Sequence, residues 1–150
     1  MMEKVKVYID TSVISALFDA RTPERQQLTK LMWESLNNYD IYISEIVMEE
    51  LNAVSDDKKG SFYTIVEGFT ILKVTDEIEN LATEYVKQGI FPDKYFDDAL
   101  HVAIASANKI SYLLSWNFKH LVKVKTRRMV ALVNSIKDYQ PVEIIAPPEL

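Results

Sequence analysis

The sequence predicts an α/β protein: a mainly parallel sheet of about five strands with helices on both faces. Short runs of β-branched and aromatic residues alternate with helical patterns along the whole chain. Strands that are separated by helices are joined by right-handed crossovers, which place the strands parallel. The chain has 150 residues, of which 48% are hydrophobic, so it can bury one sizeable core. We therefore expect a single domain over residues 1–150.

Five runs predict the strands, because they are rich in the residues that favour extended backbone. In chain order they are VKVYI (5–9), YDIYI (39–43), FTILKV (69–74), SYLLSW (111–116) and VEIIA (142–146). In a parallel α/β sheet the ligand cleft lies beyond the carboxyl ends of the strands. The residues that follow these runs are therefore the candidates for a functional site.

Capping residues mark where the predicted helices begin. Asp10, Ser44 and Thr75 are predicted N-caps because each precedes an apolar run. Pro23 marks a further start, since proline suits the first helical position. The helices expected from these starts and from apolar periodicity cover 13–18, 23–36, 45–54, a brief stretch after the polar segment 56–60, 76–89, 94–108 and 126–136. In the second of these helices, the buried face is predicted from Leu28, Leu31, Met32 and Leu36.

Composition excludes several kinds of site. Without cysteine the chain has no disulfide, thiolate metal ligand or cysteine nucleophile. With glycine only at 60, 68 and 89, neither a P-loop nor a dinucleotide-binding glycine motif is present, and no GxSxG motif occurs. The longest uncharged run, 99–108, is too short to span a bilayer, which needs roughly 20 residues. The amino-terminal stretch is interrupted by acidic residues, unlike a signal peptide, so we expect a cytoplasmic protein.

Polar and acidic side chains follow the strands or lie in the helices next to them. Asp10 follows the first strand, and Ser115 and Asn117 follow the fourth. The pair Glu49–Glu50 lies in the helix after the second strand, and Asp97–Asp98 lies in the first turns of the helix before the fourth. Carboxylates brought together repel one another unless a cation lies between them. Mg²⁺ and Mn²⁺ prefer such oxygen ligands, so we expect a divalent-cation site.

Helical geometry leaves the choice within each acidic pair open. Adjacent helical residues point about 100° apart, so one member of each pair faces the cleft. Spacing alone does not separate Glu49 from Glu50 or Asp97 from Asp98. His101 can pair with Asp98, bond Asp97 or pack in the core. We favour a structural role for His101 over direct catalysis, because carboxylate-rich magnesium sites seldom need imidazole.

A basic segment stands out from an acidic chain whose net charge is −5. Residues 119–128 contain no acid and five basic residues: Lys119, Lys123, Lys125, Arg127 and Arg128. Charge patterning alone favours a solvated surface for this segment over a binding site.

Four motifs together resemble those of PIN-domain ribonucleases, a family that includes toxins of bacterial and archaeal toxin–antitoxin pairs. VYIDTSVISALF resembles the first motif, a strand that ends in Asp followed by Thr or Ser. ISEIVMEEL resembles the second and selects Glu50, and DALHVAIASA resembles the third and selects Asp98. YLLSWNFKHL resembles the fourth, in which Ser115 matches a Thr or Ser two residues before the last acid.

This resemblance implies a three-layer α/β/α PIN-like fold and Mg²⁺- or Mn²⁺-dependent hydrolysis of RNA phosphodiester bonds. It implies that Asp10, Glu50 and Asp98 are metal ligands and that Asn117 positions water or a second metal. Thr11 and Ser12 would hydrogen-bond the site or the phosphate. The basic segment 119–128 then becomes an RNA-binding rim. An antitoxin partner and a homodimer are also implied.

The fourth motif departs from the family, because many members have Asp where this chain has Asn117. Asp97 is left with three possible roles: a flanking residue, a cap or a substitute for that missing acid. A second hypothesis is therefore a catalytically weakened PIN-like module that binds RNA or a protein. A haloacid-dehalogenase-like phosphatase ranks last, because it needs a second Asp where Ser12 stands.

Overall fold

The computed structural model describes residues 3–54 and 56–150, which contain a five-stranded, all-parallel sheet. The strands are β1 (Lys6–Ile9), β2 (Asp40–Ser44), β3 (Thr70–Leu72), β4 (Tyr112–Leu114) and β5 (Glu143–Ile145), in the order β3-β2-β1-β4-β5. Each strand falls within the run that predicted it, except that β2 extends one residue further, to Ser44. The predicted α/β class and parallel sheet are confirmed.

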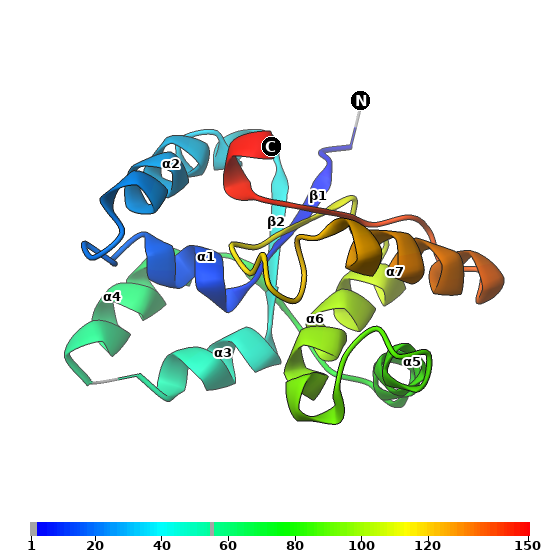
Figure 1. Cartoon of the computed structure of the whole chain (residues 1–150). Helices are drawn as coiled ribbons and strands as arrows, with labels where there is room; N and C mark the ends of the chain where they lie inside the picture. The colour runs from blue at the N-terminus through cyan, green and yellow to red at the C-terminus, as the bar shows by residue number, and fades with distance from the viewer. Residues whose placement is uncertain (1–2, 55) are drawn as a thin grey trace.

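Seven α-helices accompany the sheet in the part of the chain that the structure describes. They are α1 (Thr11–Ala16), α2 (Pro23–Trp33), α3 (Glu45–Asn52), α4 (Asp56–Val66), α5 (Asp76–Lys87), α6 (Phe96–Ala107) and α7 (Val124–Ile136), with 3₁₀ turns at Leu36–Asn38, Asp93–Tyr95 and Pro147–Glu149. In Figure 1 the helices α1 to α4 lie on one side of β1 and β2, and α5 to α7 lie on the other. None of the described helices is long and apolar enough to cross a membrane.

Strand order reverses at β1, and this reversal positions the site. From β1 the chain builds β2 and β3 toward one edge of the sheet, and then β4 and β5 toward the other. Ile9 is in register with Leu114, and the Asp10 amide donates to the Leu114 carbonyl at 3.2 Å. The ends of β1 and β4 therefore lie side by side at the switch point where α/β sheets form their ligand crevice.

The predicted N-caps Asp10, Ser44 and Thr75 are confirmed. Each side chain accepts a hydrogen bond from the backbone amide three residues on, at 3.3 Å in all three cases. Such a bond satisfies one of the amides that the first helical turn leaves free. Asp10 and Ser44 thereby end their strands and begin α1 and α3 directly.

The predicted buried face of the second helix is partly wrong. Leu28 and Leu31 are 39% and 54% exposed. Thr29 is fully buried, and Leu36 belongs to a separate 3₁₀ turn because α2 ends at Trp33. The Thr29 hydroxyl donates to the Arg25 carbonyl and accepts from the Trp116 indole, so its burial leaves no polar group unpaired. A hydrophobic period does not reveal this pairing.

Two other boundaries differ from the prediction. The segment 56–60, expected to be a polar connection, is the beginning of α4. The helix expected over 94–108 begins as the 3₁₀ turn Asp93–Tyr95 and continues as α6. Every residue of α6 from Ala99 to Ser106 is buried, which explains why that run is apolar on all faces.

Candidate functional site

Asp10 lies buried at the end of β1 and is tied to the end of β4. The Ser12 hydroxyl donates to Asp10 Oδ1 at 2.6 Å and accepts from the Trp116 amide at 2.9 Å. Burial raises the pKa of Asp10, against the opposing effects of the His101 charge and of hydrogen bonds from Ser115 and Ser12. Thus Ser12, predicted as a supporting residue, holds two neighbouring strand ends together around this carboxylate.

Glu50 of α3 faces the same crevice, whereas Glu49 is exposed. Two donors meet at Glu50 Oε1: the Thr11 hydroxyl at 2.8 Å and His101 Nε2 at 2.9 Å. Burial alone would raise the pKa of Glu50, but the hydrogen bond and charge of His101, aided by Thr11, outweigh it and lower the pKa. Of the two adjacent acids, Glu50 therefore has the partners of a site residue.

His101 is 3% exposed and bonds neither of the aspartates that the sequence left as its partners. Its Nε2 contacts Glu50, and its Nδ1 lies 2.6 Å from the hydroxyl of fully buried Tyr8, which lies 2.7 Å from Ser44 Oγ. Burial opposes the positive charge on His101, but Glu50, together with the charges of Asp10 and Asp98, raises its pKa. A chain of hydrogen bonds thus links Ser44, Tyr8, His101 and Glu50 in that order. It begins at the N-cap of α3, passes through β1 and α6, and ends within α3.

Asp98 lies in the first turn of α6, half-buried, while its neighbour Asp97 is exposed. His120 Nδ1 lies 2.9 Å from Asp98 Oδ2, and the Tyr95 ring packs against the imidazole with ring centroids 3.9 Å apart. No hydrogen bond in the described residues links Asp97 to this group, so its possible role as a substitute acid gains no support.

Asn117 is occupied in shaping the turn after β4. Its Oδ1 accepts from the His120 amide at 2.9 Å, and its carbonyl accepts from the Leu121 and Val122 amides. Its own amide donates to Ser115 Oγ at 2.9 Å. The amide oxygen expected to position water or a metal is therefore bonded to backbone, and the turn that it stabilises carries His120 to Asp98.

Hydrogen bonds tie the three candidate ligands to the segments that follow β1 and β4: Asp10 to Ser12, Glu50 to Thr11 and Asp98 to His120. Among residues 3–54 and 56–150, however, no three His, Asp or Glu side chains are grouped as a metal would require. Both hydrogen bonds to Glu50 end on Oε1 and the one to Asp98 ends on Oδ2, so each keeps a second oxygen for a cation.

Sequence reasoning missed His120 and Tyr8 as members of this group. His120 stands three residues after Asn117, and an Asn in that position commonly bonds the backbone of the turn that follows it. That signal was available, but it does not reveal that the turn brings His120 to Asp98. Tyr8 looked like any strand residue, because its partners lie 36 and 93 positions away.

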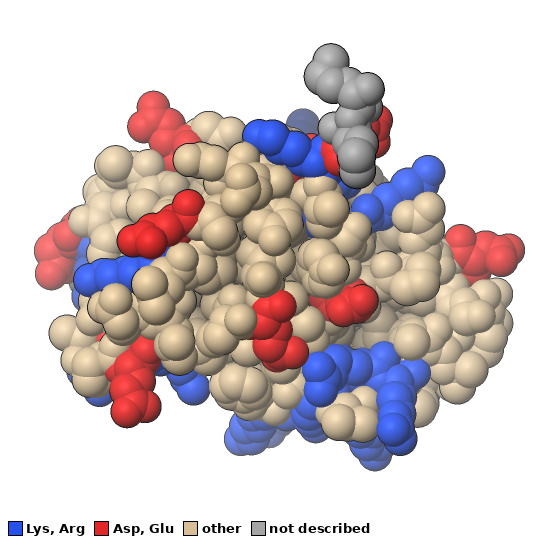
Figure 2. Space-filling model, turned by 90° about the horizontal axis from the view of Figure 1, so that it is seen from above, with Lys and Arg blue, Asp and Glu red and all other residues tan. Residues whose placement is uncertain are grey.

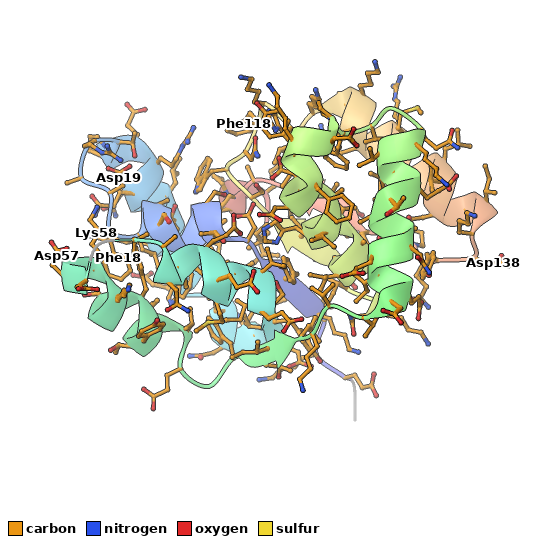
Figure 3. The ribbon with its side chains drawn as sticks, turned by 90° about the horizontal axis from the view of Figure 1, so that it is seen from below. Phe18, Asp19, Asp57, Lys58, Phe118 and Asp138 are labelled. Atoms are coloured by element: carbon orange, nitrogen blue, oxygen red, sulfur yellow. The ribbon has the colours of Figure 1, made fainter. Side chains whose placement is uncertain are left out.

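The basic segment 119–128 lies between β4 and α7 and extends into that helix. Lys123 is the N-cap of α7 without a side-chain capping bond, and the first turn of α7 holds no acid. Lysine and arginine side chains gather at the lower right of the face in Figure 2. On the other side of the turn, half-exposed Phe118 lies between α2 and α6 in Figure 3, with the Arg25 guanidinium 5.8 Å from its ring.

Comparison with known families identifies the fold. The family model of the PIN domain matches residues 7–119, which include all four motifs up to Lys119. The chain belongs to the PIN domain family. No curated protein matches the chain.

Solved structures share this fold at low sequence identity. A toxin–antitoxin complex from Klebsiella pneumoniae has a TM-score of 0.62 and 16% identity, covering 94% of this chain and 97% of that one. VapC20 of Mycobacterium tuberculosis, described as a toxin that cleaves the sarcin–ricin loop, has a TM-score of 0.59 and 18% identity over 76% and 92%. VapBC2 from Rickettsia felis, bound to a DNA fragment of its promoter, has a TM-score of 0.58 and 16% identity over 95% and 98%.

Proposed function

We propose that this chain is a Mg²⁺- or Mn²⁺-dependent endoribonuclease and the toxin of a toxin–antitoxin pair. The observation that carries the proposal is that hydrogen bonds tie Asp10, Glu50 and Asp98 to the segments that follow β1 and β4, at the switch point of a PIN fold. Structures of similar fold support it, since they include a toxin that cleaves RNA and toxins in complex with antitoxins. A cytoplasmic location and a homodimer remain predictions from sequence.

The donor set fits a hard divalent cation, because carboxylate oxygens are what Mg²⁺ and Mn²⁺ prefer. Asp10, Glu50 and Asp98 would hold the ion. When bound, such an ion polarises a phosphoryl oxygen and lowers the pKa of an attacking water. The protein contributes the fixed positions of these acids: Ser12 holds Asp10, Thr11 and His101 hold Glu50, and His120 holds Asp98.

The basic segment supports RNA as the substrate. A helix amino terminus already carries partial positive charge, so further cations there are unfavourable for the helix itself. The first two turns of α7 nevertheless hold Lys125, Arg127 and Arg128, next to Lys123 at the N-cap and to Lys119 before it. This concentration of charge favours the phosphate groups of an RNA backbone.

A catalytically weakened module that binds RNA or a protein is the second candidate. The observation in its favour is that histidines already pair with Glu50 and Asp98, while Asn117 is engaged in a turn. In this case the acids would be a structural remnant and no divalent ion would be needed.

An RNA cleavage assay with Asp98→Asn separates the two candidates. We expect wild-type protein to cut RNA with Mn²⁺ and to stop when EDTA removes the metal. Asp98→Asn should lower the rate at least about 100-fold, the upper end of the range for residues that support a metal site. Asp97→Asn is the matched control, because it removes the same charge one residue away from an exposed position.

Two results would count against the nuclease. Cleavage by Asp98→Asn at the wild-type rate would remove Asp98 from the site. RNA binding without cleavage, together with calorimetry that detects no Mn²⁺ binding, would establish the interaction module instead.

A further inference from the structure

A surface hollow of about 400 Å³ is lined in part by His120, the residue that bonds Asp98. Its lining comes from the segment that leads into α6 and from the turn after β4. The lining residues that matter here are Phe91, Lys94, Tyr95, Lys119, His120 and Lys123. Its volume lies within the range of small-ligand sites.

The charge of this hollow suits an anion. Lys94, Lys119 and Lys123 are all exposed at its rim, and none of the described residues that line it is acidic. Lys123 also caps α7, so the amino-terminal end of that helix adds to the positive field. A larger hollow of about 630 Å³ next to α5 differs in this respect, because Glu77 and Glu84 line it together with Lys87 and Lys137.

The wall of the hollow offers an aromatic ring. Tyr95 is partly exposed, and its ring is held by the T-shaped contact with His120. The Lys94 ammonium lies over the same ring, 5.1 Å from its centroid. Aromatic rings beside several cations are the combination that binds single-stranded nucleic acid, through base stacking and phosphate contacts.

His120 connects the hollow to the candidate site. Its ring lines the hollow, and its Nδ1 lies 2.9 Å from Asp98 Oδ2. One imidazole therefore separates the hollow from an acid of the proposed metal site.

We propose that this hollow is a nucleotide-binding subsite for single-stranded RNA and that it takes the nucleotide next to the cleaved bond. The base stacks on Tyr95 in the place that the Lys94 ammonium now occupies. Lys94, Lys119 and Lys123 then contact the flanking phosphates. This subsite rests on the ribonuclease function proposed above and adds Tyr95 and Lys94, which the basic segment does not include.

RNA binding in EDTA tests the subsite without cleavage. The probe is a set of labelled eight-nucleotide RNAs, each with 2-aminopurine at a different position. Wild-type protein should quench the 2-aminopurine fluorescence at one of these positions, because the base there stacks on Tyr95. Tyr95→Leu should abolish that quenching and weaken binding about tenfold, within the range for loss of one base–aromatic stack. Tyr95→Phe should keep both, and Tyr63→Leu, an exposed tyrosine on α4, is the matched control.

The lysines are tested by salt dependence. For two lost phosphate contacts on a single strand, Lys119→Gln with Lys123→Gln should make the slope of log K against log salt shallower by about 1.4. Lys73→Gln, exposed after β3, should leave it unchanged. An RNA with an abasic nucleotide at the quenched position should bind wild-type protein about tenfold more weakly. That measurement needs no variant, so the proposal stays testable if Tyr95→Leu does not fold.

The outcomes separate the two proposals. If wild-type protein cuts RNA with Mn²⁺ but abasic RNA and Tyr95→Leu bind normally, the subsite is wrong and the nuclease stands. If wild-type protein neither binds nor cuts RNA, the proposed function itself is overturned. If the abasic RNA binds as tightly as intact RNA while Lys119→Gln with Lys123→Gln flattens the salt dependence, the hollow is a general phosphate contact and the stacking role is wrong.

Discussion

Two histidines hold two of the three candidate carboxylates. His101 bonds Glu50 from a fully enclosed position, and His120 bonds Asp98 at the edge of the hollow. Asp10 has no such partner and relies on hydroxyl groups, including that of Ser12. A buried charge is costly unless it is paired and hydrogen-bonded. These contacts therefore reduce the cost of placing acidic side chains next to an apolar helix.

Asn117 provides a test of the turn that carries His120. Asn117→Ala removes the acceptor for the His120 amide and should cost about 1 kcal/mol of unfolding free energy, the usual value of one hydrogen bond. Asn117→Asp keeps an acceptor oxygen and should keep most of that stability. Urea unfolding of both variants measures the difference, and equal loss in both would contradict the role of this oxygen.

The same pair of variants addresses the departure from the family motif. If the missing acid limits activity, Asn117→Asp should cut RNA faster than wild type. A slower or unchanged rate would indicate that Asn117 acts through the turn alone.

Helix α6 is the element on which the site depends, because it carries Asp98 at its start and His101 one turn later. It packs mainly against α5 and also contacts α3. Small residues make this close packing possible: Ala99, Ala103 and Ala105 are fully buried. The uncharged run 99–108 therefore lies mostly in a buried helix of the core.

Enlarging a side chain in α6 tests how tightly this helix is packed. Ala103→Leu should destabilise the fold by about 1–3 kcal/mol, because a close-packed core cannot admit three further carbon atoms without strain. Ala131→Leu on the exposed face of α7 is the matched control and should change stability by about 0.5 kcal/mol or less. Thermal unfolding measures the stability change of both variants. Equal changes would show that the core around α6 is not closely packed.

Helix starts were predicted correctly where a single capping residue determines them. The N-caps Asp10, Ser44 and Thr75 were predictable because the capping bond spans only three residues. The buried face of α2 was not, since the burial of Thr29 depends on the indole of Trp116, 87 residues later. Periodicity therefore found the helix but misplaced its inner face.

Across the molecule, one buried hydroxyl joins three helices. Tyr85 of α5 bonds Ser106 of α6 and Asn134 of α7, and its ring is fully buried. Burial raises the pKa of Tyr85, against the opposing effect of its hydrogen bonds with Ser106 and Asn134.

This pKa shift predicts how stability depends on alkaline pH. Above pH about 10 the unfolded chain loses the Tyr85 proton while the folded protein keeps it, so the free energy of unfolding falls as pH rises. Tyr85→Phe lacks this group, so its stability should fall less steeply above pH 10, although it starts lower because two hydrogen bonds are lost. Urea unfolding between pH 8 and pH 11 measures both slopes, and parallel curves would contradict the prediction.

The fold class and the family could be predicted from sequence alone. The strand runs, the capping residues and the four motifs each depend on residues that are close together in the chain. The choice of Glu50 and Asp98 came from the motifs, and the fold places both toward the crevice while Glu49 and Asp97 stay exposed. What the acids bond to could not be inferred. His101 pairs with Glu50, and His120 pairs with Asp98, only because α3, α6 and the turn after β4 meet at the end of β1. Such contacts join residues 22 to 51 positions apart, and no local pattern encodes them.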